Sequence, residues 1–186
     1  MLSVFQSRLQ CAAGGLAVLM AACLAFSSGE AFAQQKHKFS FKAPPGTTKF
    51  TQTHLMEVGD VPGHQIRIAE IQSKYPGEAP VYDGLKVVEA RGVLVSDYVD
   101  GSGNAMTYTV NTMENGDKIF TRGTVMALTT IGSDGARRTS FTSVVALTGG
   151  TGKFIGIRGT LRGSGFSDIK TGTSGTQTEG EYWLEK

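Results

Sequence analysis

The sequence predicts an all-β protein built as one eight-stranded antiparallel β-barrel. Segments rich in β-branched and aromatic residues recur along the chain, and short connections of Gly, Asp, Asn and Ser separate them. No segment of ordinary helix length has the 3.6-residue apolar period of an amphipathic helix. A two-sheet sandwich is the other solution, but a closed barrel pairs the edge strands that a chain without helices would otherwise expose.

Eight strands are expected, and most of their connections are short. Asn115-Gly116 is a strong hairpin signal, and residues 73–85 form a longer loop. Several of the 25 glycines fall inside strands, where they weaken pairing but permit the tight coiling of a small barrel. The expected strands are 50–58, 64–71, 86–97, 105–111, 118–131, 137–147, 155–168 and 173–184.

Residues 1–33 have the pattern of a secretory signal peptide. Arg8 precedes an apolar run over 12–26, and Ala31-Phe32-Ala33 is a small-x-small cleavage site. The run is shorter than the roughly 20 residues of a membrane span, so no stable membrane insertion is expected. An alternative is lipid modification of Cys23, which the apolar residues after it disfavour. We predict cleavage after Ala33 and a secreted or periplasmic protein.

The mature chain is expected to be a flexible leader, residues 34–48, followed by one barrel domain, residues 49–186. Pro44-Pro45 cannot lie in a central strand. Both cysteines, Cys11 and Cys23, precede the cleavage site, so the mature chain has no thiol or disulfide. The net charge of +2, with both signs scattered along the chain, gives no indication of nucleic-acid binding.

A glycine-rich corner lies within residues 144–165. Its Gly150-Thr151-Gly152-Lys153 run is not a P-loop, because Leu147 occupies the first glycine position and Phe154 follows the lysine. The dinucleotide motif fails as well, since it would place its last glycine at Ile155. We interpret the corner as structural, with backbone turns that only glycine or a very small residue permits. The corner residues are Thr148, Gly149, Gly150, Gly152, Phe154, Gly156 and Gly159.

The run ALTGGTGKFIGIRG, residues 146–159, resembles the passage that allene oxide cyclases and dirigent proteins carry late in an eight-stranded barrel. The resemblance covers about residues 87–186 and suggests a bacterial secreted member of that superfamily. It implies an apolar lumen, frequent assembly as a homotrimer, and no metal or organic cofactor. Cyclases of this superfamily steer ring closure of a fatty-acid epoxide with the help of a lumenal carboxylate. Dirigent members steer the coupling of phenoxy radicals. The first third of the chain departs from the family pattern, so no catalytic residue is carried over.

Strand alternation supplies the candidate site. His64, Ile66, Ile68 and Glu70 share one face of segment 64–71, and a hairpin register centred on Gly59 sets His54 opposite His64 and Phe50 opposite Ile68. If the isoleucines point inward, Glu70 is a lumenal carboxylate with a raised pKa and the candidate catalytic residue. The histidines could relay protons or bind a metal, or could simply be solvated at the barrel mouth. The candidate ligand-binding residues are His54, His64, Ile66, Ile68 and Tyr108.

Three further side chains complete the sequence-based expectations. Glu89 and Arg91 are expected to form a surface charge pair, Tyr108 to be core or to orient a ligand, and Trp183 to seal a barrel end or a subunit contact. The leading hypothesis is a barrel that binds a small apolar molecule, and the family resemblance adds the expectation that it steers the cyclisation or isomerisation of that molecule. The alternatives are a filled barrel acting as an envelope interaction module and, less favoured, a lipocalin-type carrier.

Overall fold

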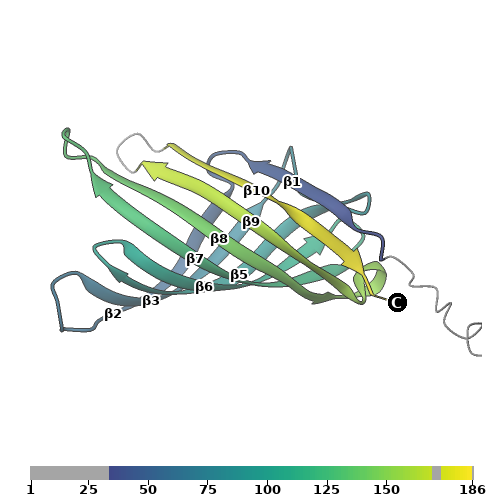
Figure 1. The fold of residues 1–186 in the computed structure, drawn as a ribbon, viewed down its shortest axis with the longest axis horizontal. Helices are drawn as coiled ribbons and strands as arrows, with labels where there is room; N and C mark the ends of the chain where they lie inside the picture. The colour runs from purple at the N-terminus through teal and green to yellow at the C-terminus, as the bar shows by residue number, and fades with distance from the viewer. Residues whose placement is uncertain (1–33, 169–172, 186) are drawn as a thin grey trace, which may run out of the picture. The chain divides into compact units, whose positions relative to one another are not determined.

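The computed structural model describes residues 34–168 and 173–185, which belong to the compact unit Gln34–Lys186. The expected signal peptide, residues 1–33, lies outside the described residues. The unit is built from antiparallel strands and one short 3-10 helix (Figure 1). No helix in the described ranges has the length and apolar character that crossing a membrane requires. The elements are β1 (His37–Ala43), β2 (Thr48–Glu57), β3 (His64–Lys74), β4 (Val81–Tyr82), β5 (Leu85–Val99), β6 (Ser102–Met113), β7 (Lys118–Ile131), β8 (Arg137–Gly150), η1 (Gly152–Phe154), β9 (Ile157–Asp168) and β10 (Thr173–Leu184).

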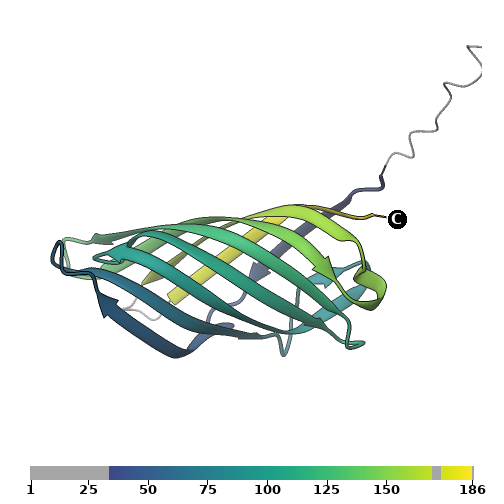
Figure 2. The ribbon, with the colours of Figure 1, turned by 90° about the horizontal axis from the view of Figure 1, so that it is seen from below.

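The strands form one curled sheet in the order β1-β10-β9-β8-β7-β6-β5-β3-β2, with β4 paired to β5. Figure 2 shows the sheet bending round on itself as a half-barrel. Its two edge strands, β1 and β2, follow each other in the chain but are not ladder partners within the described residues. A backbone hydrogen bond from the Lys74 nitrogen to the Thr47 oxygen, 3.3 Å long, ties the start of β2 to the end of β3.

All eight expected strands are present, two of them with the predicted bounds, so the all-β antiparallel prediction is confirmed. The flexible leader is a correction, because residues 37–43 form β1 and pair with β10. Phe39 and Phe41 are two residues apart, so a strand places both rings on one face. Phe39 is 6% exposed and stacks on Tyr82, with the ring centroids 4.6 Å apart. Pro44 and Pro45 end the strand instead, as proline in a ladder must.

The two faces of the sheet differ in burial. One face, called here the core face, carries the buried members of each strand, such as Ala69 on β3, Leu94 on β5 and Ala105 on β6. The opposite, outer face carries exposed side chains at the alternate positions, such as Ile68 and Val93. The strand period of two therefore assigns every side chain of the sheet to one face or the other.

A hydrophobic cluster fills one end of the core face. It packs together residues from β1, β4, β9, β10 and the strands between them, and its members are Phe39, Tyr82, Val87, Met113, Ile119, Leu147, Phe154, Ile157, Leu161 and Tyr182. The turn after β4 is fastened to this end because the Asp83 nitrogen donates to the Tyr182 hydroxyl at 2.7 Å. This end of the half-barrel is a packed core.

The glycine-rich corner closes that packed end. Phe154, in η1, is fully buried in the cluster. Gly152 and Gly156 adopt left-handed φ values of 54° and 77°. A Cβ at Gly152 would overlap the Asp117 carboxylate, which accepts a 3.0 Å hydrogen bond from the Lys153 nitrogen. The corner therefore turns the chain and inserts one aromatic ring into the core.

Candidate functional site

The register of β2, β3 and β5 places the sequence-predicted site on the outer face. His54 pairs with Ile68, and Ile68 pairs with Val95. Ile68 is 48% exposed, whereas its neighbour Ala69 is 1% exposed. His54, His64, Ile66, Ile68 and Glu70 thus share a face, as predicted, but that face points away from the core, and the lumenal placement is wrong.

The predicted register of the β2–β3 hairpin is also wrong. Phe50 pairs with Ile71 rather than Ile68, and a register shift separates Phe50 from Thr53. The shift puts Phe50 on the core face while His54 stays on the outer face. Glu70 accepts a 3.3 Å hydrogen bond from the Thr51 hydroxyl on β2. Glu70 therefore lies in an exposed polar setting and cannot act on a molecule held at the core face.

Tyr108 likewise lies on the outer face. It is 43% exposed, pairs with Val93, and lies under the Arg122 guanidinium, whose carbon is 5.6 Å from the ring centroid. The expected surface charge pair is present on the same face, with Arg91 Nε 2.9 Å from Glu89 Oε2. Hydrogen bonds from Arg91 and Gln72 hold the pKa of Glu89 below its usual value.

His64 is held by two carboxylates at the rim of the sheet. Its Nδ1 lies 2.6 Å from Asp60 Oδ1, and its Nε2 lies 2.8 Å from Asp97 Oδ1. The hydrogen bond to Asp97, followed by that to Asp60, raises the pKa of His64. The hydrogen bond with His64 in turn lowers the pKa of Asp60. This arrangement stabilises an imidazolium that joins the β2–β3 connection to β5.

A polar pocket of about 300 Å³ opens on the core face, away from the hydrophobic cluster. Arg67 of β3 and Ser96 of β5 are register partners in its wall. Arg137, at the start of β8, donates from Nη2 to the backbone oxygen of Asp100 at 2.6 Å. The lining residues are Gly63, Gln65, Arg67, Ser96, Tyr98, Asp100, Gly101 and Arg137.

Two polar atoms in this pocket are buried without a partner. Among the described residues, Arg67 Nε and Ser96 Oγ make no hydrogen bond, although Ser96 is only 1% exposed. The Arg67 guanidinium carbon lies 5.4 Å from the ring centroid of Phe50 and 6.0 Å from that of Tyr98. Burial raises the pKa of Tyr98, an effect that the Arg67 charge opposes. Because an unpartnered buried donor is costly, such a pair of atoms points to a binding site.

Strand alternation places Arg67 on the face of β3 opposite Ile68 but does not by itself assign it to a site. The available signal was an arginine alternating with Ala69 and Ile71 on a short strand. Ser96 and Arg137 carried no such signal, because their approach to Arg67 depends on strand register and on the curl of the sheet. We take the pocket around Arg67 and Ser96 as the candidate functional site.

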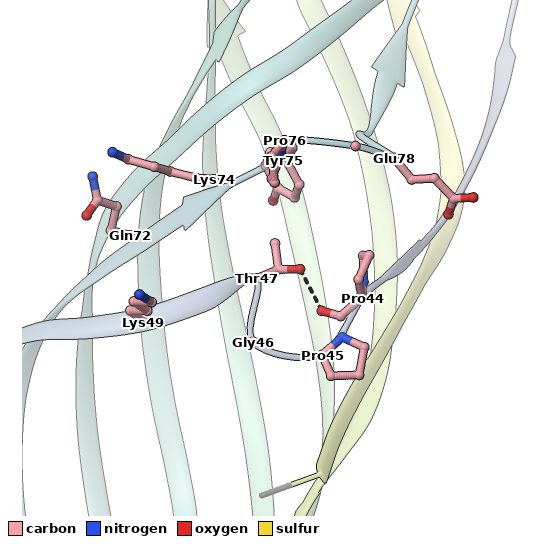
Figure 3. A pocket seen from close by; sticks show the side chains of 11 residues that line it. Pro44, Pro45, Gly46, Thr47, Lys49, Gln72, Lys74, Tyr75, Pro76 and Glu78 are labelled. Carbon is pink, nitrogen blue, oxygen red and sulfur yellow. Dashed lines mark hydrogen bonds between the residues drawn. The ribbon is translucent and has the colours of Figure 1, made fainter.

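A second pocket, of about 510 Å³, lies beside the β1–β2 turn (Figure 3). The turn is closed by the Thr47 hydroxyl, which donates to the Pro44 oxygen at 2.6 Å. Lys49 and Lys74 contribute to the wall, and the half-buried ring of Tyr75 packs edge-on against Phe41 at 5.7 Å. Among the described residues, the buried polar atoms that lack a hydrogen-bond partner all lie outside this hollow, so it does not share the signature of the Arg67 pocket.

Within the described ranges, no group of three His, Cys, Asp or Glu side chains is arranged to hold a metal ion. The two carboxylates at His64 instead act as hydrogen-bond partners of its ring.

Comparison with known proteins finds similarity of fold. The chain resembles the solved structure of the pterocarpan synthase dirigent protein PsPTS1, with 19% identity and a TM-score of 0.45 over 83% of this chain and 97% of that one. It also resembles the pterocarpan synthase dirigent protein GePTS1, with 17% identity and a TM-score of 0.43 over 82% and 85% of the two chains. No family model and no curated protein matches the sequence. Both solved structures are similar to this chain in fold alone.

Proposed function

We propose that this protein binds a small, largely apolar molecule on the core face of its curled sheet, between the hydrophobic cluster and the Arg67 pocket. The observation that carries the proposal is the 300 Å³ pocket in which the Ser96 hydroxyl and Arg67 Nε are buried without partners. A concave site with a few converging polar groups beside apolar side chains is the usual form of a small-molecule site.

Steering of a cyclisation or isomerisation is part of the same proposal. Strands joined by regular ladders hold their side chains rigidly, and a ligand held in one reactive conformer needs no cofactor to react selectively. The support is the corner motif's resemblance to allene oxide cyclases and dirigent proteins. Glu70 has no part in this step because it projects from the outer face.

We further propose that the protein is exported and assembles as a homo-oligomer. Export rests on the signal-peptide pattern of residues 1–33. Assembly rests on the outer face, where apolar side chains of β3, β5, β6 and β7 lie in adjacent rows and remain exposed. These include Ile68, Val93, Met106, Tyr108, Val110 and Phe120. A contiguous apolar patch of this kind marks an interaction surface, and a trimer is expected by analogy with the family.

The alternative function, a filled barrel that serves as an interaction module, is favoured by one observation. The hydrophobic cluster packs one end of the core face with fully buried Phe154, Ile119 and Ile157. In that case the outer face alone is functional and the core face binds nothing.

Native mass spectrometry of the protein purified from its own host separates the two. A retained small mass supports ligand binding, and the same spectrum gives the number of subunits. Binding of the neutral dye Nile red is the second measurement: Tyr98→Ala, in the pocket wall, should weaken it, and Glu70→Gln, on the outer face, should leave it unchanged. A ligand-free mass together with no dye binding would favour the interaction module.

A further inference from the structure

The Arg67 pocket has the donors of an oxyanion site. Its wall presents the N–H of Arg67 Nε and the Ser96 hydroxyl, both buried and without partners among the described residues. Arg67 and Ser96 are register partners on β3 and β5, so their side chains project from the same face of the sheet and line the same pocket. A buried arginine Nε–H and a buried hydroxyl in this arrangement lack an acceptor, and an oxyanion supplies one.

The surroundings hold the Arg67 guanidinium ready for such a group. Phe50 and Tyr98 lie near it at 5.4 Å and 6.0 Å, as in cation–π contacts, which leaves hydrogen-bonding at the edge of the guanidinium unaffected. Gln65, the next pocket residue along β3, is held by its amide, which donates to Glu57 Oε1 at 2.6 Å. The Arg67 side chain is therefore oriented by packing, and it has no ion-pair partner in the part of the chain that the structure describes.

The charges lining the pocket favour a single negative charge. Arg67 and Arg137 are cationic and Asp100 is anionic, so the lining has a net charge of about +1. Arg137 is partly committed, because its Nη2 donates to the Asp100 backbone oxygen. A carboxylate or a sulfate ester balances this charge, whereas a phosphate monoester at neutral pH brings nearly twice as much.

We propose that the Arg67–Ser96 pair is an oxyanion subsite, and that the molecule bound on the core face carries one monoanionic oxygen group, a carboxylate or a sulfate. This inference rests on the proposed function for the apolar part of the ligand, but the subsite itself is testable without that part. Arg67 is then a specificity-determining residue, since its guanidinium discriminates an anionic ligand from a neutral one of the same shape.

The first experiment isolates the subsite. Protein purified from cells expressing the full chain is titrated with acetate, methyl sulfate and inorganic phosphate while the arginine Nε–H resonances are followed by NMR. We expect a saturable shift of the Arg67 resonance, strongest with the monoanions, and no saturable shift for Arg162, which lies exposed on β9. An Arg67 resonance that moves no more than that of Arg162 overturns the proposal. A response to phosphate alone overturns the monoanion assignment.

The second experiment joins the subsite to the apolar site. Octanoate and octyl sulfate should bind at least tenfold more tightly than octan-1-ol, because a charge-assisted hydrogen bond in a buried site is worth about that factor or more. Arg67→Gln should abolish the difference while octan-1-ol binding persists, and Arg162→Gln should preserve it. Arg67→Lys keeps the charge without the fork geometry and should recover only part of the preference.

The outcomes separate the two proposals. Equal binding of the alcohol and the anions refutes the subsite and leaves the proposed function standing. Failure of every octyl probe together with a saturable acetate shift at Arg67 refutes apolar ligand binding and leaves the subsite standing. Should Arg67→Gln fail to fold, the Arg67→Lys variant and the NMR titration of the unmodified protein still decide the matter.

Discussion

Replacing Phe154 with alanine tests whether the glycine-rich corner anchors the packed end of the half-barrel. The Phe154 side chain is 0% exposed and belongs to the hydrophobic cluster with Ile157 and Leu147. Removing a fully buried phenylalanine costs about 3–5 kcal/mol, the sum of lost transfer free energy and the cavity that remains. That loss is a large share of the roughly 5–15 kcal/mol by which a domain is stable.

Urea unfolding followed by far-UV circular dichroism and by the fluorescence of Trp183, the sole tryptophan, measures the loss. Ile155→Ala is the matched control, because Ile155 adjoins Phe154 in the same corner but is 70% exposed. The control should change the free energy of unfolding by no more than about 0.5 kcal/mol. A loss below about 1.5 kcal/mol for Phe154→Ala, with an unchanged urea dependence, would refute the assignment of this ring to the core.

Two further predictions concern the backbone of the corner and the charges at the rim. Gly156→Ala should lower the free energy of unfolding by more than about 1 kcal/mol, because φ is 77° at this position and a Cβ would meet the Glu185 backbone oxygen. Gly77→Ala, in open space, should be nearly neutral, and equal losses for the two variants would contradict this reasoning. The ion pairs of His64 should stabilise the fold fully below its ordinary pKa of 6.5, and the stabilisation should be lost as the pH rises through the raised value. Toward acid, the contribution of Asp60 should be lost as the pH falls through its lowered pKa. Thermal melts across this range should show both slopes, and His64→Gln should remove the one near neutral pH; an unchanged profile would show that the carboxylates do not hold the imidazolium.

The local signals in the sequence were sufficient for eight of the strands and for the turn at Asn115-Gly116. The Asn115-Gly116 turn lies between β6 and β7, as predicted, and strands 118–131 and 173–184 have the predicted bounds. These features depend on neighbouring residues alone, because turn residues and β-branched runs act through their own backbone preferences. β1 was missed because its pairing partner, β10, lies at the other end of the chain.

The faces of the sheet were decided only by the tertiary structure. β3 carries Ile66 and Ile68 on one face and Ala69 and Ile71 on the other, so its apolar pattern fits either orientation. A slip of one residue in the pairing register moves every side chain of a strand to the opposite face. The register shift after Phe50 does this within β2, where Phe50 pairs with Ile71 on the core face and His54 pairs with Ile68 on the outer face. The sequence by itself determined eight of the strands and predicted a structural role for the corner, whose Phe154 is buried in the hydrophobic cluster. The sequence predicted His54, His64 and Glu70 on the core face, whereas the structure places Arg67 and Ser96 there. That difference depends on the long-range pairing that sets the register.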